Sequence, residues 1–222
     1  MESYDVWEDI MQNGPLSDFG LRYAIGLTNW GSSPLYGATK LGGAYALNTT
    51  LSSHSLEGIY NVGIDTQHRQ KWVFGAGLGY ESDVYKFANE YVDFADSGDG
   101  SVATFVAMDH AGDWTTRFVA RYITVPLRVK WVAYKKFSVD LTVIPGMGYN
   151  GKHTGLKHEG KVDGEKAFDR LNLTNLMDFK LDTRLSLGWK PFYAFVQFSC
   201  LPMFINMTET AYPIKFGIML EP

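Results

Sequence analysis

Residues 19–28 read Phe-Gly-Leu-Arg-Tyr-Ala-Ile-Gly-Leu-Thr, and this stretch decides the fold class. Its odd positions are large and apolar, whereas most of its even positions are small or charged. A repeat of two residues is the period of a β-strand, because successive side chains point to opposite faces of a sheet. The stretch therefore predicts a strand with one apolar face and one small, polar face.

The same alternation recurs seven more times along the chain, at 55–65, 71–86, 117–132, 136–149, 178–189, 191–205 and 212–221. Short turns, as at 66–70, alternate with long connections at 30–54, 88–115 and 150–177. Up-and-down membrane barrels show this asymmetry, with short periplasmic turns and long extracellular loops. The sequence therefore predicts an all-β protein, an up-and-down antiparallel transmembrane β-barrel of about eight strands.

The second long connection contains a hairpin signal. An Asp-Gly pair at 99–100 lies between extended-looking stretches at 83–95 and 101–109, and such pairs favour tight hairpin turns. Within these stretches, charged and apolar residues occupy positions that would face the same side of a strand. We therefore interpret the stretches as a hairpin above the bilayer. The alternative is that they are two further barrel strands, which would give ten. We expect an N-terminal periplasmic segment at 1–18 and a single barrel domain at 19–222.

The composition of the two faces indicates which one meets lipid. One parity carries almost no charge, whereas the other combines glycines, such as Gly75, Gly77 and Gly79, with both signs of charge. A narrow eight-stranded barrel has an interior that small residues and paired ions can fill, so the ionic face is predicted to line a closed lumen. The predicted lumen ion network consists of Arg22, Glu57, Glu81, Arg128, Lys130, Asp140, Lys180, Asp182, Arg184 and Lys215.

Aromatic residues flank the predicted turns and rims. Such residues collect where a bilayer meets water. The predicted membrane-interface aromatics are Phe19, Trp72, Tyr80, Trp131, Phe137, Tyr149, Trp189 and Phe192. The alternative is a soluble barrel in which aromatics cap the ends of the core.

The stretch 121–131, Arg-Tyr-Ile-Thr-Val-Pro-Leu-Arg-Val-Lys-Trp, carries a family resemblance. It is similar to the proline-containing strand of the small porin-like outer-membrane β-barrel domain proteins, which the chain resembles in pattern over nearly its whole length. The resemblance implies an eight-stranded barrel in the outer membrane of a Gram-negative bacterium. Pro126 removes one ladder hydrogen bond, so an irregularity is expected there. The chain departs from the family by ending on Glu221-Pro222 and not on an aromatic residue.

Composition argues against several other classes. The net charge is -4 and the sequence contains no basic cluster, which argues against a nucleic-acid partner. Cys200 is the only cysteine, so an intrachain disulfide is excluded.

The first residues read like those of an exported protein whose leader has been replaced by a methionine, and we expect the natural protein to carry a signal peptide.

Some outer-membrane barrels are enzymes that place Ser, His or Asp at the extracellular rim. The candidate histidines here are His54, His110, His153 and His158, with Ser53 and Ser101 as nearby hydroxyls. Neighbouring strand residues point to opposite faces, so we expect no catalytic residue. The spacing of His153 and His158 is not that of a zinc motif, and we expect neither a metal nor a cofactor.

The leading hypothesis is a structural, adhesion or binding role through the long extracellular loops, without catalysis. Loops on a rigid scaffold are where binding sites evolve. The expected partners are outer-membrane lipid and an extracellular or outer-membrane protein that contacts the loops. The alternatives are a rim enzyme (a lipid acyl hydrolase or transferase, or a protease), a narrow pore, and a soluble lipid-binding barrel.

Overall fold

Strands dominate the structure, a computed structural model that describes residues 16–33, 41–65, 71–99, 101–133, 137–149, 154–171 and 175–222. The wall strands are β1 (Leu16–Gly31), β3 (Thr50–Asp65), β4 (Lys71–Phe87), β7 (Asp113–Thr124), β8 (Leu127–Val132), β9 (Phe137–Gly148), β12 (Phe179–Trp189), β13 (Phe192–Ser199) and β14 (Tyr212–Leu220). The described helix is the short 3-10 turn η1 (Gly43–Tyr45). In the described part of the chain, no helix has the length and hydropathy needed to cross a membrane.

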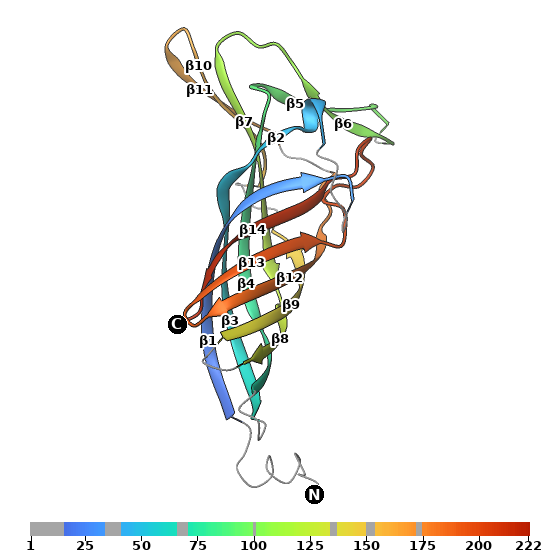
Figure 1. Ribbon diagram of the computed structural model, residues 1–222. Helices are drawn as coiled ribbons and strands as arrows, with labels where there is room; N and C mark the ends of the chain where they lie inside the picture. The colour runs from blue at the N-terminus through green and yellow to red at the C-terminus, as the bar shows by residue number, and fades with distance from the viewer. Residues whose placement is uncertain are drawn as a thin grey trace, which may run out of the picture.

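The wall strands form a closed antiparallel ring (Figure 1). Apart from β7 and β8, consecutive wall strands pair with each other, and the last strand, β14, pairs with β1. β7 and β8 share one position in the ring, because both of them lie between β4 and β9. The ring therefore has eight positions, which confirms the predicted up-and-down barrel. The hairpin of β5 (Val92–Asp96) and β6 (Ala103–Ala107) is a separate sheet, so the ten-strand alternative is wrong.

The expected irregularity at Pro126 is confirmed. β7 ends at Thr124 and β8 begins at Leu127. The proline has no N–H to donate to the ladder. Its carbonyl oxygen accepts from the Gly77 N–H at 3.1 Å, and the Val125 N–H donates to the Pro145 carbonyl at 2.9 Å. Backbone contacts therefore keep the wall connected across the break.

Burial alternates along the wall strands, with the apolar face outside. In β1, Arg22 is 1% exposed, whereas its neighbours Leu21 and Tyr23 are 53% and 45% exposed. Across the barrel in β12, Arg184 is 1% exposed and Leu185 is 40% exposed. A soluble barrel buries its apolar face, so the wall has the inverted arrangement of a transmembrane barrel.

The connections at one rim are long and partly structured, and they correct two sequence expectations. The predicted strand 191–205 is too long, because β13 ends at Ser199 and residues 200–211 form a further long connection. The predicted loop 150–177 contains a hairpin of β10 (Gly155–Val162) and β11 (Glu165–Leu171). At its turn, Asp163 and Gly164 have φ values of 52° and 83°, as in the type I′ turns that suit hairpins.

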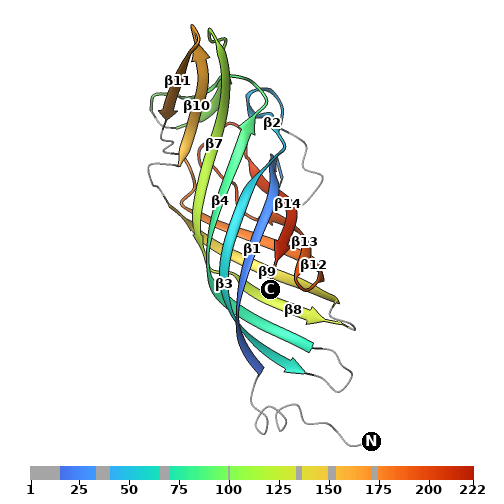
Figure 2. The same ribbon diagram turned by 90° about the vertical axis from the view of Figure 1, so that its left-hand side faces the viewer.

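Two smaller boundaries also move. β4 continues to Phe87, so residues 83–87 belong to the wall rather than to a hairpin arm. Within the predicted loop 30–54, the short β2 (Leu47–Asn48) pairs with the end of β4, and β3 already begins at Thr50. These strands extend the wall above the predicted membrane zone. Figure 2 shows β4, β7, β10 and β11 side by side in this extension.

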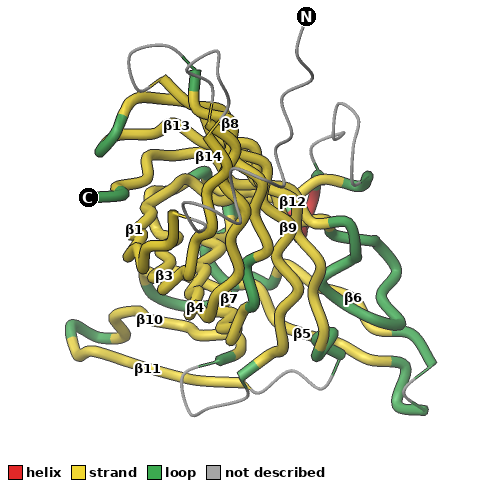
Figure 3. The backbone as a smooth tube through the Cα atoms, turned by 90° about the horizontal axis from the view of Figure 1, so that it is seen from below, coloured by secondary structure: helices red, strands yellow, loops and turns green. Residues whose placement is uncertain are grey.

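The two ends of the described chain lie at the rim with short connections (Figure 1). Residues 1–15 are outside the described residues, and residues 16–18 belong to β1, so the predicted periplasmic segment stays a prediction. Viewed from below in Figure 3, the β10–β11 and β5–β6 hairpins lie to the side of the wall strands. The elaborated structure is therefore concentrated at the rim opposite the chain ends.

The close approach of β3 and β4 at Gly77 gives a test of the wall packing. A Cβ added at Gly77 would lie 2.0 Å from the carbonyl oxygen of Gly58. We expect Gly77→Ala to lower the free energy of unfolding by about 1–3 kcal/mol, because the two strands must move apart. Denaturant unfolding in lipid vesicles measures the change. Gly42→Ala is the matched control, because a Cβ there meets nothing within 4 Å; equal stabilities of the two variants would contradict the close approach.

Candidate functional site

The ten side chains predicted for the lumen all lie inside the barrel, and each is at most 6% exposed. They form ion pairs with one another and with two acids outside the predicted network, Asp83 and Glu221. Alternation places Asp83 on the same face of its strand as Glu81, and Glu221 on the same face as Lys215. Both Glu81 and Lys215 are predicted lumen residues. Strict continuation of the alternation to the ends of these strands would have found Asp83 and Glu221.

The tier nearest the short connections is built around Glu221. Its Oε1 lies 3.0 Å from Arg128 NH2 and 2.9 Å from Lys130 Nζ. Lys130 also donates to the hydroxyl of Tyr193 at 2.9 Å. Arg128 Nε lies 3.2 Å from an Asp140 carboxylate oxygen, which connects this tier to the next one.

The middle tier joins β1, β3, β9 and β12 across the lumen. Arg184 NH2 donates to Glu57 Oε1 at 2.6 Å. Arg22 lies 3.5 Å from both Glu57 and Asp140. In the ring, β9 lies opposite β1 and β12 lies opposite β3, so the Arg22–Asp140 and Arg184–Glu57 pairs connect opposite walls of the barrel.

The upper tier centres on Glu81, which accepts hydrogen bonds from both Lys180 and Lys215. Lys215 is also 2.7 Å from Asp83, and Lys180 is 2.8 Å from Asp182. Gln197, which is not part of the predicted network, connects this tier to the middle one. Its amide donates to Asp182 at 2.6 Å and to Glu81 at 3.1 Å, and its oxygen accepts from Arg184 at 2.8 Å.

The charges of this network balance. With Asp83 and Glu221 there are six acids and six bases, and each base lies within 4.0 Å of a carboxylate oxygen. Buried charges are costly unless they are paired and hydrogen-bonded. The network therefore acts as a cross-linked filling of the lumen.

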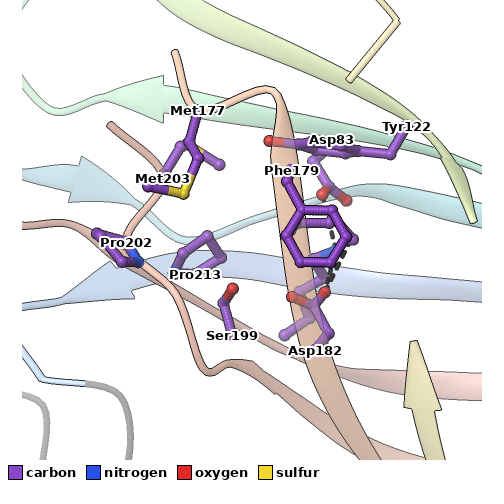
Figure 4. A pocket seen from close by; sticks show the side chains of 11 residues that line it. Asp83, Tyr122, Met177, Phe179, Asp182, Ser199, Pro202, Met203 and Pro213 are labelled. Carbon is purple, nitrogen blue, oxygen red and sulfur yellow. Dashed lines mark ion pairs between the residues drawn. The ribbon is translucent and has the colours of Figure 1, made fainter. Parts of the chain in front are cut away.

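Little space remains above the network. The cavity between it and the loops has a volume of about 10 Å³, which is roughly enough for one water molecule. Figure 4 shows Asp83, Asp182 and Tyr122 on one side of this cavity and Met203, Pro202 and Pro213 on the other. A larger cavity of about 560 Å³ at the other end includes Lys71, Lys190 and Glu221 in its lining. A vestibule thus lies at the rim with short connections, and the ion network lies between it and the small cavity.

We expect the folded protein to show little steady conductance in planar bilayers. Buried acids and bases form ion pairs across the lumen, and an eight-stranded barrel has an interior that side chains can fill. Single-channel recording after reconstitution measures this, with protein-free bilayers as the control. Reproducible large open-channel steps from folded protein would contradict a filled lumen.

The predicted interface aromatics lie on the outer surface. Six of them are between 41% and 67% exposed, namely Phe19, Trp72, Tyr80, Tyr149, Trp189 and Phe192. The remaining two are half-buried by neighbours on the same surface: Trp131 pairs with Trp72 across β4 and β8, and the Phe137 ring centroid lies 4.9 Å from that of Trp189. Their contact with the edges of a bilayer stays a prediction.

Above the lumen, the long connections fold into a cap with its own hydrophobic core. Trp30 lies at its centre, 2% exposed, with its ring stacked at 5.0 Å on Tyr85 and its Nε1 donating to the Tyr45 carbonyl at 2.8 Å. Phe204, from the connection after β13, packs edge-on against Trp30 at 5.8 Å. The core of the cap further includes Leu41, Leu47, Phe87, Val92, Phe105, Phe118, Tyr122, Leu156, Leu176 and Met203.

The outer part of the cap is held by stacked rings and tight turns. Tyr91 lies between His110 and His158, with ring centroids 4.5 and 4.3 Å away. The buried His158 Nε2 donates to the Val92 carbonyl at 2.7 Å, which joins β10 to β5. In the β5–β6 turn, hydrogen bonds from Ser101 and Ser97 lower the pKa of Asp99 to about 2. The cap is therefore an ordered unit rather than a set of separate loops.

The structure separates the residues considered for catalysis. Ser53 points into the lumen and donates to Asp83 at 2.6 Å, whereas the adjacent His54 is exposed on the outer surface. His110 and His158 are occupied by the ring stack, and His153 is outside the described residues. Among the described residues, no group of three or more His, Cys, Asp or Glu side chains is arranged to hold a metal ion.

Neither a family model nor a curated protein matches the sequence. Among solved structures, the chain is similar to Ail, the attachment invasion locus protein of Yersinia pestis, in a crystal structure with the heparin analogue sucrose octasulfate. The sequence identity is 10% and the TM-score is 0.33, and the match covers 93% of this chain and 97% of that one. It is also similar to a mutant of the Rh. blastica porin, at 8% identity and a TM-score of 0.22 over 93% of this chain and all of that one. The strand pairing and the outward apolar face give the chain the fold of a small, eight-stranded outer-membrane β-barrel.

Proposed function

We propose that the protein is a non-catalytic, non-conducting recognition barrel of the Gram-negative outer membrane, which presents its cap to the outside of the cell for adhesion or binding. The observation that carries the proposal is the cap itself. Its buried core draws on four connections, around residues 41–47, 87–105, 156–176 and 203–211. A core of this kind holds a surface in one shape, and a preformed surface loses less entropy on binding than flexible loops do.

Three features support this function over a pore, an enzyme or a soluble carrier. The filled lumen supports a scaffold role rather than transport. The separation of Ser53 from His54 removes the simplest nucleophile and base pair. The exposed apolar wall supports residence in a membrane, because a soluble carrier keeps such residues inside.

Topology on intact cells tests the orientation. In a Cys200→Ala background, we expect a membrane-impermeant maleimide to label Gly98→Cys in the β5–β6 turn and not Lys190→Cys at the opposite rim. Lysed cells are the control, in which both positions react. Labelling of Lys190→Cys alone on intact cells would invert the topology and remove the cap from the cell surface.

Retention of cells on a surface tests the recognition role. Cells expressing the protein are washed over immobilised fibronectin, laminin and collagen and over epithelial monolayers, and expressing cells are expected to be retained more than non-expressing cells on at least one of them. Val102 and Met108 are exposed apolar residues of the cap region, at 47% and 45%. The variant Val102→Ser with Met108→Ser is expected to lower retention, and Leu21→Ala in the wall is the control. Equal retention with and without the protein on every surface would overturn the adhesion role.

A further inference from the structure

Four cations lie in one row across the sheet that extends above the barrel wall. Lys86 of β4 is paired with Arg117 of β7, Arg117 with Lys157 of β10, and Lys157 with Arg170 of β11. Residues directly opposite each other on neighbouring strands share a face, and neighbouring strands are about 4.8 Å apart. The row therefore extends about 14 Å across four strands that lie side by side in Figure 2.

The row is on the outer face, the same face that meets lipid below. In β7, the inward residues Phe118, Ala120 and Tyr122 are at most 3% exposed, whereas Ile123 is 54% exposed on the outside. Arg117 shares the parity of Ile123, and Arg121 lies between them on the same face. At about 3.3 Å per residue, the row lies about 20 Å along the strand from Ile123. It is thus a side-wall feature above the apolar belt, not a feature of the top of the cap.

These cations lack the pairing that the lumen provides. In the described part of the chain, the row has one ion pair, between Arg117 and Glu159, and the Nε atoms of Arg117, Arg121 and Arg170 have no hydrogen-bond partner. Lys157 is 8% exposed and lies between two arginines of the row. Burial lowers the pKa of Lys157, and the positive charges of Arg170, Arg117 and Arg121 lower it further. Like charges directly opposite each other on neighbouring strands are destabilising, so the row favours an anionic ligand.

We propose that the row Lys86–Arg117–Lys157–Arg170, with Arg121 below it, binds the phosphate groups of glycolipid headgroups in the outer leaflet around the barrel. Guanidinium groups match phosphate with two parallel hydrogen bonds, and a lysine between them adds charge. Basic residues next to a membrane surface attract anionic headgroups. This site rests on the outer-membrane placement proposed above, but it does not need the cap to bind anything.

Lipid titration of the purified, folded full-length chain tests the site. The protein in neutral detergent micelles is titrated with bisphosphorylated lipid A, and bound lipid is counted by native mass spectrometry. The variant Lys157→Gln with Arg170→Gln removes two charges from the row. The matched control is Lys161→Gln with Lys166→Gln, which also removes two charges. Lys161 and Lys166 are paired across the same hairpin and lie on the same face as the row, but farther from the apolar belt of the wall. We expect about tenfold weaker binding for the row variant and an unchanged affinity for the control.

Three further arms separate the sources of anion. The natural chain is expected to bind dephosphorylated lipid A about as weakly as the row variant binds bisphosphorylated lipid A. Millimolar inorganic phosphate and heparin are expected not to displace bisphosphorylated lipid A from the natural chain. Equal lipid binding by the row variant and the natural chain would overturn the proposal, as would equal affinity for dephosphorylated lipid. Row-dependent heparin binding without row-dependent lipid binding would also overturn it and assign the row to an external polyanion. A heat-dependent shift in gel mobility shows that each variant is folded. The lipid titration uses purified protein, so its result can be interpreted even if the cell-surface topology test fails.

Discussion

Replacing Glu81 by glutamine is expected to lower the free energy of unfolding by about 3–5 kcal/mol, because it leaves two buried ammonium groups without their shared partner. Glu81 is 2% exposed and accepts hydrogen bonds from both Lys180 and Lys215. Glutamine keeps the shape of the side chain, so packing changes little and the loss is electrostatic. Denaturant unfolding of vesicle-embedded protein, followed by tryptophan fluorescence, measures the change.

The chain offers a matched control in its exposed ion pair. Arg117 and Glu159 also contact each other, but their side chains are 38% and 47% exposed. Exposed pairs contribute less than about 1 kcal/mol, because water solvates both partners when they separate. Glu159→Gln is therefore expected to change the stability little. Equal effects of Glu81→Gln and Glu159→Gln would show that water reaches the lumen network.

A double variant separates charge pairing from other effects of the substitution. Adding Lys215→Met to Glu81→Gln removes one of the two cations that share Glu81, so the double variant is expected to lose less stability than the sum of the two single variants. The single variant Lys215→Met is needed to complete the cycle, because it leaves Asp83 without its 2.7 Å partner. Strict additivity of the two single changes would contradict direct coupling between Glu81 and Lys215.

Replacing Val125 by arginine is expected to lower the free energy of unfolding by about 2–4 kcal/mol in a bilayer, because the side chain points outward near the middle of the wall. Val125 is 41% exposed, and it lies between the outward residues Ile123 and Leu127. The same substitution at Val102 in the cap, which is 47% exposed, is the matched control and is expected to change the stability little. The two positions differ mainly in the medium that surrounds them.

Comparison of these two arginine variants tests the membrane assignment directly. In a water-soluble barrel of this shape, both valines would be in contact with water, and both substitutions would be tolerated. Unfolding from lipid vesicles gives the two free energies. Equal, small effects at positions 125 and 102 would overturn the assignment of the outer wall to lipid.

The sequence by itself determined the wall of this protein and the direction in which its side chains point. Alternation is a property of the extended backbone, so Arg22 and Leu21 were placed on opposite faces without any tertiary contact. Eight alternating stretches gave eight ring positions, and the missing N–H of Pro126 located the break between β7 and β8.

The tertiary structure decided everything that depends on strand register or on contacts between connections. Phe204 belongs to the cap core and not to the predicted strand 191–205, because β13 ends at Ser199 and the chain then folds over the lumen. The sequence shows no basic cluster, yet Lys86, Arg117 and Lys157 become neighbours, because antiparallel pairing aligns residues from three separate strands. The periodicity of one strand fixes the faces of that strand, whereas closure of the barrel fixes which residues of different strands meet.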